Sequence, residues 1–326
     1  MSVLYNNPNL KKCGLLFGFV DYLSIWGFIM ATDATRRFDL KNLTVRICSA
    51  AIFAALFLTL LWFGEAPWAK LAFLVLLAAA AFAGVREFAM MGAKMGHFPS
   101  LGAGTILAWG ILAHCHLWGM ERAESLPLWL VLFVGALVIH LSALFSRRNL
   151  DNALSSQGIT WLAGLYLGLG LGFQQKLFMF NQTTLENTGA RLLLALFLIV
   201  WLGDAGAYFA GSRFGKHKLA PRISPKKTWE GAAGNIIGNI AGAAVIKFFV
   251  CTDWSPIDLV AIAILLGVAG ILGDLAESAW KRSAGVKDSY FGISIPGHGG
   301  ILDRVDSLIF AAPALYAYVH FVHGLN

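Results

Sequence analysis

The chain has 326 residues, of which 58% are hydrophobic and only 13% are charged, and its mean hydropathy is +0.68. A soluble domain carries about 25% charged residues, so this composition excludes an ordinary water-soluble globular protein and predicts an integral membrane protein. The net charge of +7 is attributed to membrane orientation and an anionic lipid surface, and no nucleic acid partner is expected.

Apolar runs of about 20 residues, long enough to cross a bilayer as a helix, recur from residue 47 to the end of the chain. They predict an all-α polytopic membrane protein with about nine transmembrane helices. The predicted spans are 47–64, 71–90, 101–119, 126–145, 157–173, 190–212, 231–251, 257–280 and 305–323.

The distribution of Lys and Arg predicts how these spans are oriented, because cytoplasmic loops are enriched in both residues. If the N-terminus is cytoplasmic, all but five of the 25 Lys and Arg residues fall in cytoplasmic segments. The five on the opposite side are Lys70, Arg122, Lys176, Arg191 and Lys247. We therefore expect a cytoplasmic N-terminus and an external C-terminus.

Three regions are expected along the chain. Residues 1–45 form an N-terminal cytoplasmic or interfacial segment, because the apolar stretch 14–30 is short and contains Asp21. Residues 46–189 form a membrane scaffold of spans one to five. The first four of these spans have almost no intramembrane charge and nothing that suggests catalysis. Residues 190–326, with spans six to nine, form the predicted catalytic membrane domain.

Asp204 interrupts the apolar run of the sixth span. A carboxylate in that position is costly unless it is paired, hydrated or bound to a metal. A functional role and a buried structural hydrogen bond are equally good interpretations of Asp204 alone.

The loop after the sixth span contains the sequence SPKKT, residues 224–228. Ser224 followed by Pro225 predicts the start of a helix. Free backbone N–H groups at such a start bind phosphate, and Lys226, Lys227 and Thr228 would point at the same place.

Two groups of charged residues flank the last loop. Asp274, Ser278 and Lys281 occur at i, i+4 and i+7 and therefore share one face of the eighth span. Asp303 and Asp306 share a face at the start of the ninth span.

The predicted topology brings the acidic residues together on the cytoplasmic side, since spans six, eight and nine all have their inner ends there. The four aspartates are Asp204, Asp274, Asp303 and Asp306, and the basic residues around them are Lys226, Lys227, Lys281, Arg282 and Arg304. Four such carboxylates would repel one another unless they shared cations, and hard oxygen ligands suit Mg²⁺. This arrangement predicts phosphoryl or nucleotidyl chemistry on a nucleoside triphosphate.

The segment from Ser278 to Asp306 closely resembles the signature of the phosphatidate cytidylyltransferases, also called CDP-diacylglycerol synthases. The matching residues are Ser278, Lys281, Arg282, Lys287, Asp288, His298, Gly299, Gly300, Asp303, Arg304 and Asp306. The segments GDAGAYFAGSRFGKHKL and SPKKTWEG resemble a second characteristic region of that family. Two features depart from the pattern: Trp280 replaces an aliphatic residue, and the segment from Asp288 to His298 is slightly longer than usual.

The resemblance implies transfer of CMP from CTP to phosphatidic acid or a related lipid phosphate, by an enzyme of the bacterial inner membrane whose site faces the cytoplasm. It implies that Mg²⁺ or another hard divalent cation is bound by Asp274 and Asp303, with Asp204 and Asp306 as further ligands. The implied catalytic residues are Asp274, Asp303, Lys281, Arg304 and His298. The implied substrate-binding residues are Ser224, Lys226, Lys227, Thr228, Ser278, Arg282, Lys287 and Asp288.

Two alternatives are compatible with intramembrane carboxylates. A CTP-dependent lipid kinase would use the same metal and triphosphate site but release CDP. A transporter would place its charges near the bilayer midplane within inverted repeats, and neither feature occurs in the sequence. A homodimer through a glycine stripe is also compatible with the sequence.

Overall fold

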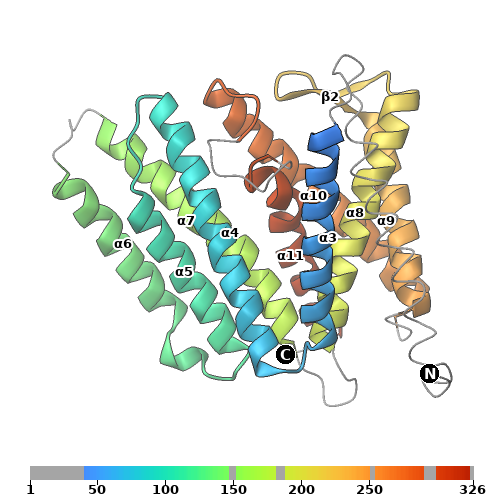
Figure 1. The fold of residues 1–326 in the computed structure, drawn as a ribbon, viewed down its shortest axis with the longest axis horizontal. Helices are drawn as coiled ribbons and strands as arrows, with labels where there is room; N and C mark the ends of the chain where they lie inside the picture. The colour runs from blue at the N-terminus through green and yellow to red at the C-terminus, as the bar shows by residue number, and fades with distance from the viewer. Residues whose placement is uncertain (1–39, 147–151, 181–187, 250–253, 290–298, 324–326) are drawn as a thin grey trace.

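A computed structural model describes residues 40–146, 152–180, 188–249, 254–289 and 299–323 of the chain. The helices of these residues are α3 (Leu40–Trp62), α4 (Pro67–Lys94), α5 (Leu101–Trp118), α6 (Leu128–Leu144), α7 (Ala153–Met179), α8 (Thr188–Phe214), α9 (Trp229–Phe249), α10 (Pro256–Ser283) and α11 (Leu302–His323) (Figure 1). The 3-10 turn η1 (Ala123–Ser125) precedes α6. The all-α class is confirmed, and each predicted span overlaps one of these helices.

Six helices of the described residues are long and apolar enough to cross a membrane. They are α4, α5, α6 with its preceding turn, α8, α10 and α11, and the segment Cys48–Trp62 of α3 is apolar but shorter. The chain is therefore a membrane protein. Nine crossings and a cytoplasmic N-terminus remain predictions, and the interfacial segment predicted for residues 1–45 lies almost entirely outside the described residues.

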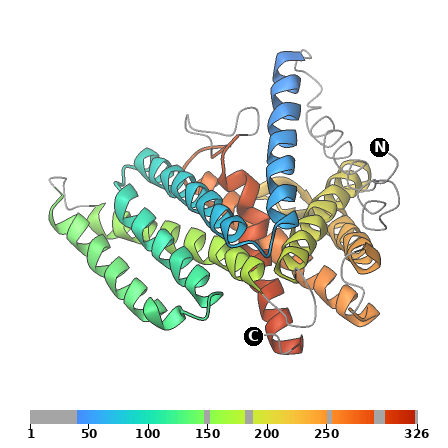
Figure 2. The same ribbon diagram turned by 60° about the horizontal axis from the view of Figure 1, so that its bottom comes forward.

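The helices form two groups that lie side by side (Figure 1). Helices α4 to α7 pack on one another in the first group, and α8 to α11 pack in the second. Helix α7 contacts both α8 and α11 and so joins the groups. Helix α3 leans away from the rest (Figure 2) and contacts α8 through Phe57, whose ring centroid lies 4.6 Å from that of Phe197. The predicted boundary between residues 189 and 190 falls close to the start of α8, and the division into separate domains remains a prediction.

Glycines allow several of these helices to approach closely. A Cβ atom added to Gly206 of α8 would overlap the backbone carbonyl of Gly234 in α9, and one added to Gly238 would overlap the carbonyl of Leu202. In α7, a Cβ atom on Gly168 would lie 3.1 Å from the Cα atom of Ala108 in α5. Small residues thus mediate close contacts between these membrane helices.

The segment around Lys226 differs from the prediction. Residues Ser224–Thr228 form strand β2, which pairs antiparallel with β1 (Lys218–Ala220). The predicted helix start at Ser224 is wrong, since α9 begins only at Trp229 and the Oγ1 atom of Thr228 accepts a hydrogen bond of 3.1 Å from the N–H of Gly231. Thr228 thus caps the helix, while pairing with β1 holds the preceding residues in an extended conformation.

We predict that Gly206→Ala destabilises the protein, because the new methyl group would force α8 away from the backbone of α9. Overpacking of this kind costs about 1–3 kcal/mol, which thermal unfolding in detergent would detect. Gly158→Ala in α7 is the matched control, since its Cβ atom would meet nothing within 4 Å. That variant should be stabilised by about 0.5–1 kcal/mol, and equal destabilisation of both would contradict the close contact.

Candidate active site

Most of the residues predicted for the site lie at one end of the helix bundle. The C-terminal ends of α8 and α10, the start of α11 and the β1–β2 hairpin all lie in the upper half of Figure 1. His298 falls outside the described residues. The structure therefore brings the described candidates to the same end, as the predicted topology required.

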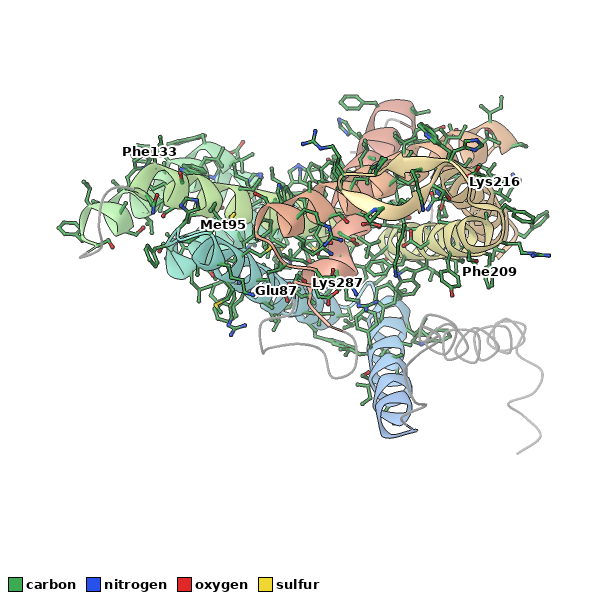
Figure 3. The ribbon with its side chains drawn as sticks, turned by 90° about the horizontal axis from the view of Figure 1, so that it is seen from above. Glu87, Met95, Phe133, Phe209, Lys216 and Lys287 are labelled. Atoms are coloured by element: carbon green, nitrogen blue, oxygen red, sulfur yellow. The ribbon has the colours of Figure 1, made fainter. Side chains whose placement is uncertain are left out.

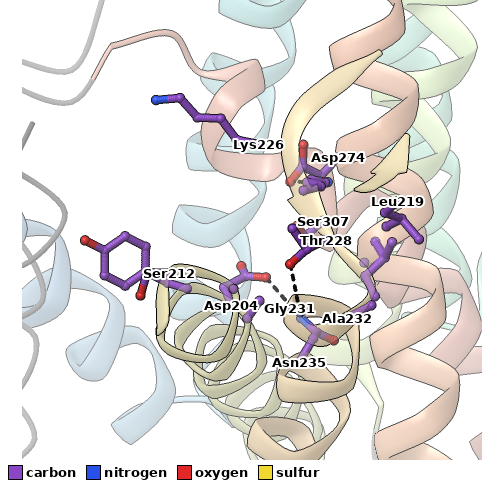
Figure 4. Close-up of a pocket in the computed structure, with 16 residues that line it drawn as sticks. Asp204, Ser212, Leu219, Lys226, Thr228, Gly231, Ala232, Asn235, Asp274 and Ser307 are labelled. Atoms are coloured by element: carbon purple, nitrogen blue, oxygen red, sulfur yellow. Dashed lines mark hydrogen bonds and ion pairs between the residues drawn. The ribbon is translucent and has the colours of Figure 1, made fainter. Parts of the chain in front are cut away.

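A cavity of about 430 Å³ opens between α8, α9, α10 and β2 (Figure 4). Its polar lining includes Asp204, Tyr208, Lys226, Lys227, Asn235 and Asp274. Small-molecule sites commonly have volumes of roughly 300–1,000 Å³. The cavity is thus large enough for a small ligand and offers both lysine and carboxylate groups to it.

Asp204 is held at the cavity wall by a chain of amide side chains. The Nδ2 atom of Asn235 lies 3.5 Å from Oδ1 of Asp204 (Figure 4). The Oδ1 atom of Asn235 accepts a hydrogen bond of 3.1 Å from Asn239, which also donates to the carbonyl of Ala263. Since both asparagines are buried, these contacts orient the Asn235 amide group toward the carboxylate.

Three carboxylates form a tight group at the ends of α10 and α11, which we call the carboxylate cluster: Asp274, Glu277 and Asp306. One oxygen of each lies within 4.8 Å of the others. The Oε1 atom of Glu277 is buried and has no hydrogen-bond partner among the described residues. Negative groups this close repel unless positive charge or protons offset them, and an all-oxygen donor set fits a hard divalent cation.

Lys281 lies between Glu277 of the carboxylate cluster and Asp303, rather than beside Asp274. Its Nζ atom is 2.5 Å from Oε2 of Glu277 and also donates to Oδ1 of Asp303. The other oxygen of Asp303 accepts a hydrogen bond of 2.9 Å from the Ser289 hydroxyl. Lys281 therefore joins α10 to α11. Asp303 is placed beside this lysine and not in the carboxylate cluster, so its assignment as a metal ligand remains a prediction.

Asp274 is the residue that connects the carboxylate cluster with the cavity. Its Oδ2 atom lies 2.5 Å from Nζ of Lys227 in β2, and Ser278 donates a hydrogen bond of 3.3 Å to its Oδ1 atom. The shared face predicted for Asp274 and Ser278 is confirmed. Lys226 is exposed and lines the same cavity, so both lysines of β2 reach it.

The remaining charged candidates lie farther out. Arg282 donates hydrogen bonds to the carbonyl oxygens of Ile223 and Val286, which fastens the loop before β2 to the end of α10. Lys287, Asp288 and Arg304 are exposed. The roles predicted for these three residues in catalysis and substrate binding are not tested by the structure and stay predictions.

A carboxylate holds the base of the hairpin, just before the span predicted at 231–251. Glu230 accepts hydrogen bonds from the backbone N–H groups of Lys216 and His217, and its Oε1 atom lies 2.6 Å from Nδ1 of His217. Hydrogen bonds from its own backbone N–H and from the His217 side chain lower the pKa of Glu230 to about 2. The carboxylate therefore stays ionised near neutral pH, and its stabilising effect is lost only in acid.

Two buried glutamates were missed by the sequence analysis. Glu277 lies beside the predicted stripe, and its position four residues before Lys281 is a recognisable ion-pair spacing. Glu87 belongs to α4, in a region expected to hold nothing catalytic, yet it is 1% exposed and accepts hydrogen bonds from the start of α11. A carboxylate inside an apolar run was the available signal.

We predict that Lys281→Met strongly destabilises the protein, because it leaves the buried Glu277 and the half-buried Asp303 without their shared cation. Removing one partner of a buried ion pair costs about 3–5 kcal/mol, which thermal unfolding in detergent would measure. Lys226→Met is the matched control, since an exposed lysine contributes within about 0.5 kcal/mol. Similar unfolding temperatures for the two variants would contradict this account of Lys281.

Comparisons with known proteins identify a family and several relatives. The model of the Cytidylyltransferase family matches residues 44–322. Over 150 residues the chain is 46% identical to a phosphatidate cytidylyltransferase of Staphylococcus haemolyticus, 47% identical to one of Staphylococcus epidermidis and 45% identical to one of Staphylococcus aureus. Each match covers 46% of this chain and 54% of the relative, so the chain spans about half the length of the curated relatives it matches.

Proposed function

The chain belongs to the cytidylyltransferase family, and we propose that it transfers CMP from CTP to phosphatidic acid, giving CDP-diacylglycerol and pyrophosphate. The observation that carries this proposal is the carboxylate cluster beside a cavity lined by Lys226 and Lys227. Carboxylates that can hold a cation, next to lysines that can hold phosphates, suit chemistry on a nucleoside triphosphate.

The site lies at the ends of membrane helices, which suits a substrate that stays in the bilayer. A lipid phosphate lies near the membrane surface while its acyl chains remain in the hydrocarbon region. The Lys and Arg distribution favours a cytoplasmic location for this end of the bundle, where CTP is available. Together with the Staphylococcus relatives, these features support a location in the bacterial inner (plasma) membrane.

The reaction can be written with residues of the chain in defined roles. An oxygen of the lipid phosphate attacks the α-phosphorus of CTP, a new O–P bond forms, and the bond to the β-phosphate breaks to release pyrophosphate. The second pKa of a phosphate monoester is about 6, so the nucleophile is largely ionised at neutral pH and needs no strong general base. Lys226 and Lys227 would bind the triphosphate and stabilise the departing pyrophosphate.

The carboxylate cluster would hold a divalent cation such as Mg²⁺, which when bound supplies positive charge to phosphate oxygens. Asp274 would help both to hold the cation and to position a phosphate-binding lysine, since its Oδ2 atom pairs with Lys227. That contact fixes the lysine beside the cation position and so aligns the triphosphate with it. Asp204 lies across the cavity, where the amide group of Asn235 holds it. In that position it would orient the nucleotide or the water molecules bound to the nucleotide.

We predict that Asp274→Asn abolishes transfer, because it removes a cation ligand and the partner of Lys227. Purified protein in detergent would be incubated with Mg²⁺, α-labelled CTP and phosphatidic acid. The wild type should move label into the lipid fraction and release pyrophosphate, and the variant should be slower by more than about 100-fold.

Asp258→Asn is the matched control, since it makes the same change at the opposite end of α10, where Asp258 pairs with Tyr318. It should keep the transfer activity if it remains folded. Label recovered as soluble CDP, with a phosphate gained by the lipid, would indicate a lipid kinase and reject the proposed reaction. Equal loss in both variants would contradict the assigned role of Asp274.

We also predict that EDTA abolishes transfer, that added Mg²⁺ restores it, and that Glu277→Gln raises the half-maximal Mg²⁺ concentration by at least about tenfold. The reason is that Glu277 supplies one of three oxygens to the carboxylate cluster. Initial rates over a Mg²⁺ titration give this concentration directly.

Asp204→Asn should change the KM for CTP more than the Mg²⁺ requirement, because Asp204 lines the cavity outside the carboxylate cluster. A larger effect on the Mg²⁺ requirement than on the KM for CTP would instead indicate that Asp204 binds the metal.

A further inference from the structure

Glu87 is a buried carboxylate in the first group of helices that contacts the backbone of the second group. Its Oε1 atom accepts a hydrogen bond of 2.7 Å from the N–H of Ile301, and its Oε2 atom accepts one of 3.0 Å from the N–H of Leu302. These contacts join residues more than 200 positions apart in the chain. Figure 3, seen from the end of the bundle where the site lies, labels Glu87 on α4.

The two N–H groups belong to the start of α11, which begins at Leu302. The first N–H groups of a helix have no partner within the helix, and a negative charge there interacts favourably with the helix dipole. Hydrogen bonds to an ionised acceptor are about twice as strong as neutral ones. Glu87 therefore binds the first turn of α11 through both of its oxygens and fixes its direction.

That turn carries the chemistry of the site. Asp303 directly follows Leu302, and Asp306 of the carboxylate cluster lies one turn farther along the same helix. Any movement of the first turn of α11 would change the distance from Asp306 to Asp274 and Glu277 on α10. The placement of the carboxylate cluster thus depends on a residue that contributes no ligand to it.

Packing around Glu87 leaves little freedom for that turn. A Cβ atom on Gly300 would overlap the Ser289 hydroxyl and lie 3.0 Å from Oε2 of Glu87. Ser289 is fully buried and donates to Asp303. Within the described residues, no Lys, Arg or His forms an ion pair with Glu87. The buried charge of Glu87 is offset chiefly by the N–H groups at the start of α11. Because hydrogen bonds require a defined geometry, this contact fixes the orientation of the first turn of α11 more closely than apolar packing would.

We propose that Glu87 is a positioning residue that sets the placement of the first turn of α11 and thereby the affinity of the carboxylate cluster for a divalent cation. The inference rests on the proposed function and deepens it by naming a residue outside the cavity on which the cation site depends. It can be tested without either substrate.

The test compares Mn²⁺ binding to wild type and Glu87→Gln, in detergent and without nucleotide or lipid, from the electron paramagnetic resonance signal of unbound Mn²⁺. The introduced glutamine would keep one acceptor oxygen, but its amide group would meet the second N–H with a donor. Residues that orient metal ligands typically contribute 10–100-fold to metal affinity. The dissociation constant should therefore rise at least about tenfold.

Thr160→Val controls for a general loss of stability. Thr160 is also buried, and its Oγ1 atom likewise accepts a hydrogen bond, of 3.0 Å, from a backbone N–H at the start of another helix, that of Ser100 at α5. This variant should have a lower unfolding temperature but bind Mn²⁺ as the wild type does. Unchanged affinity in Glu87→Gln, an equal loss in Thr160→Val at a matched unfolding temperature, or no Mn²⁺ binding by the wild type would each overturn the inference.

Transfer of label from CTP to lipid, measured on the same preparations, separates the two proposals. A wild type that binds Mn²⁺ but transfers no label, together with a weakened Glu87→Gln, would reject the proposed reaction and support the positioning role. Active wild type and Glu87→Gln with equal Mn²⁺ affinity would support the reaction and reject the positioning role.

Discussion

The candidate site depends on the way charge is buried between α10 and α11. Lys281 is 8% exposed and lies between Glu277, which is fully buried, and Asp303. Two carboxylates and one ammonium group leave a net negative charge in a region of low polarity, which is costly. The Oε1 atom of Glu277 has no hydrogen-bond partner among the described residues, so a cation bound there would offset part of this charge. The ion pairs therefore fix how far α10 and α11 can slide or turn against each other, and the positions of the carboxylate cluster follow from that.

Close backbone contact makes this arrangement possible. A Cβ atom on Gly273 of α10 would overlap the carbonyl of Asp306, so the two helices touch beside the carboxylate cluster. On the other side of the cavity, the side chain of Asn239 occupies the space that a larger residue at Gly203 would fill. In a membrane, the transfer of apolar side chains from lipid to a helix interface contributes little free energy. Close packing and the hydrogen bonds beside it therefore stabilise much of the association between helices.

Features that depend on neighbouring residues were predictable from the sequence, and features that depend on distant partners were not. Hydropathy located the helices, and the helical repeat placed Ser278 beside Asp274. The β1–β2 hairpin was missed because Ser224 and Pro225 also form a good helix start, and only pairing with β1 decides between the two. The partner of Asp303 could not be predicted from spacing. Asp274 and Lys281 lie on the same helix, and only the packing of α11 against α10 decides which of them contacts Asp303.

Glu87 is the clearest case of such a distant dependence, and it bears on how the chain is divided. A boundary between a scaffold and a catalytic half follows from where the charged motifs occur in the sequence. The start of α11, however, is bound by a side chain of α4, and α7 packs against α11. The family match likewise runs from residue 44 to residue 322, across both groups of helices. A fragment limited to α8–α11 would keep all three members of the carboxylate cluster but would lose the acceptor that holds the first turn of α11, so ligand residues alone do not define the unit that builds this site.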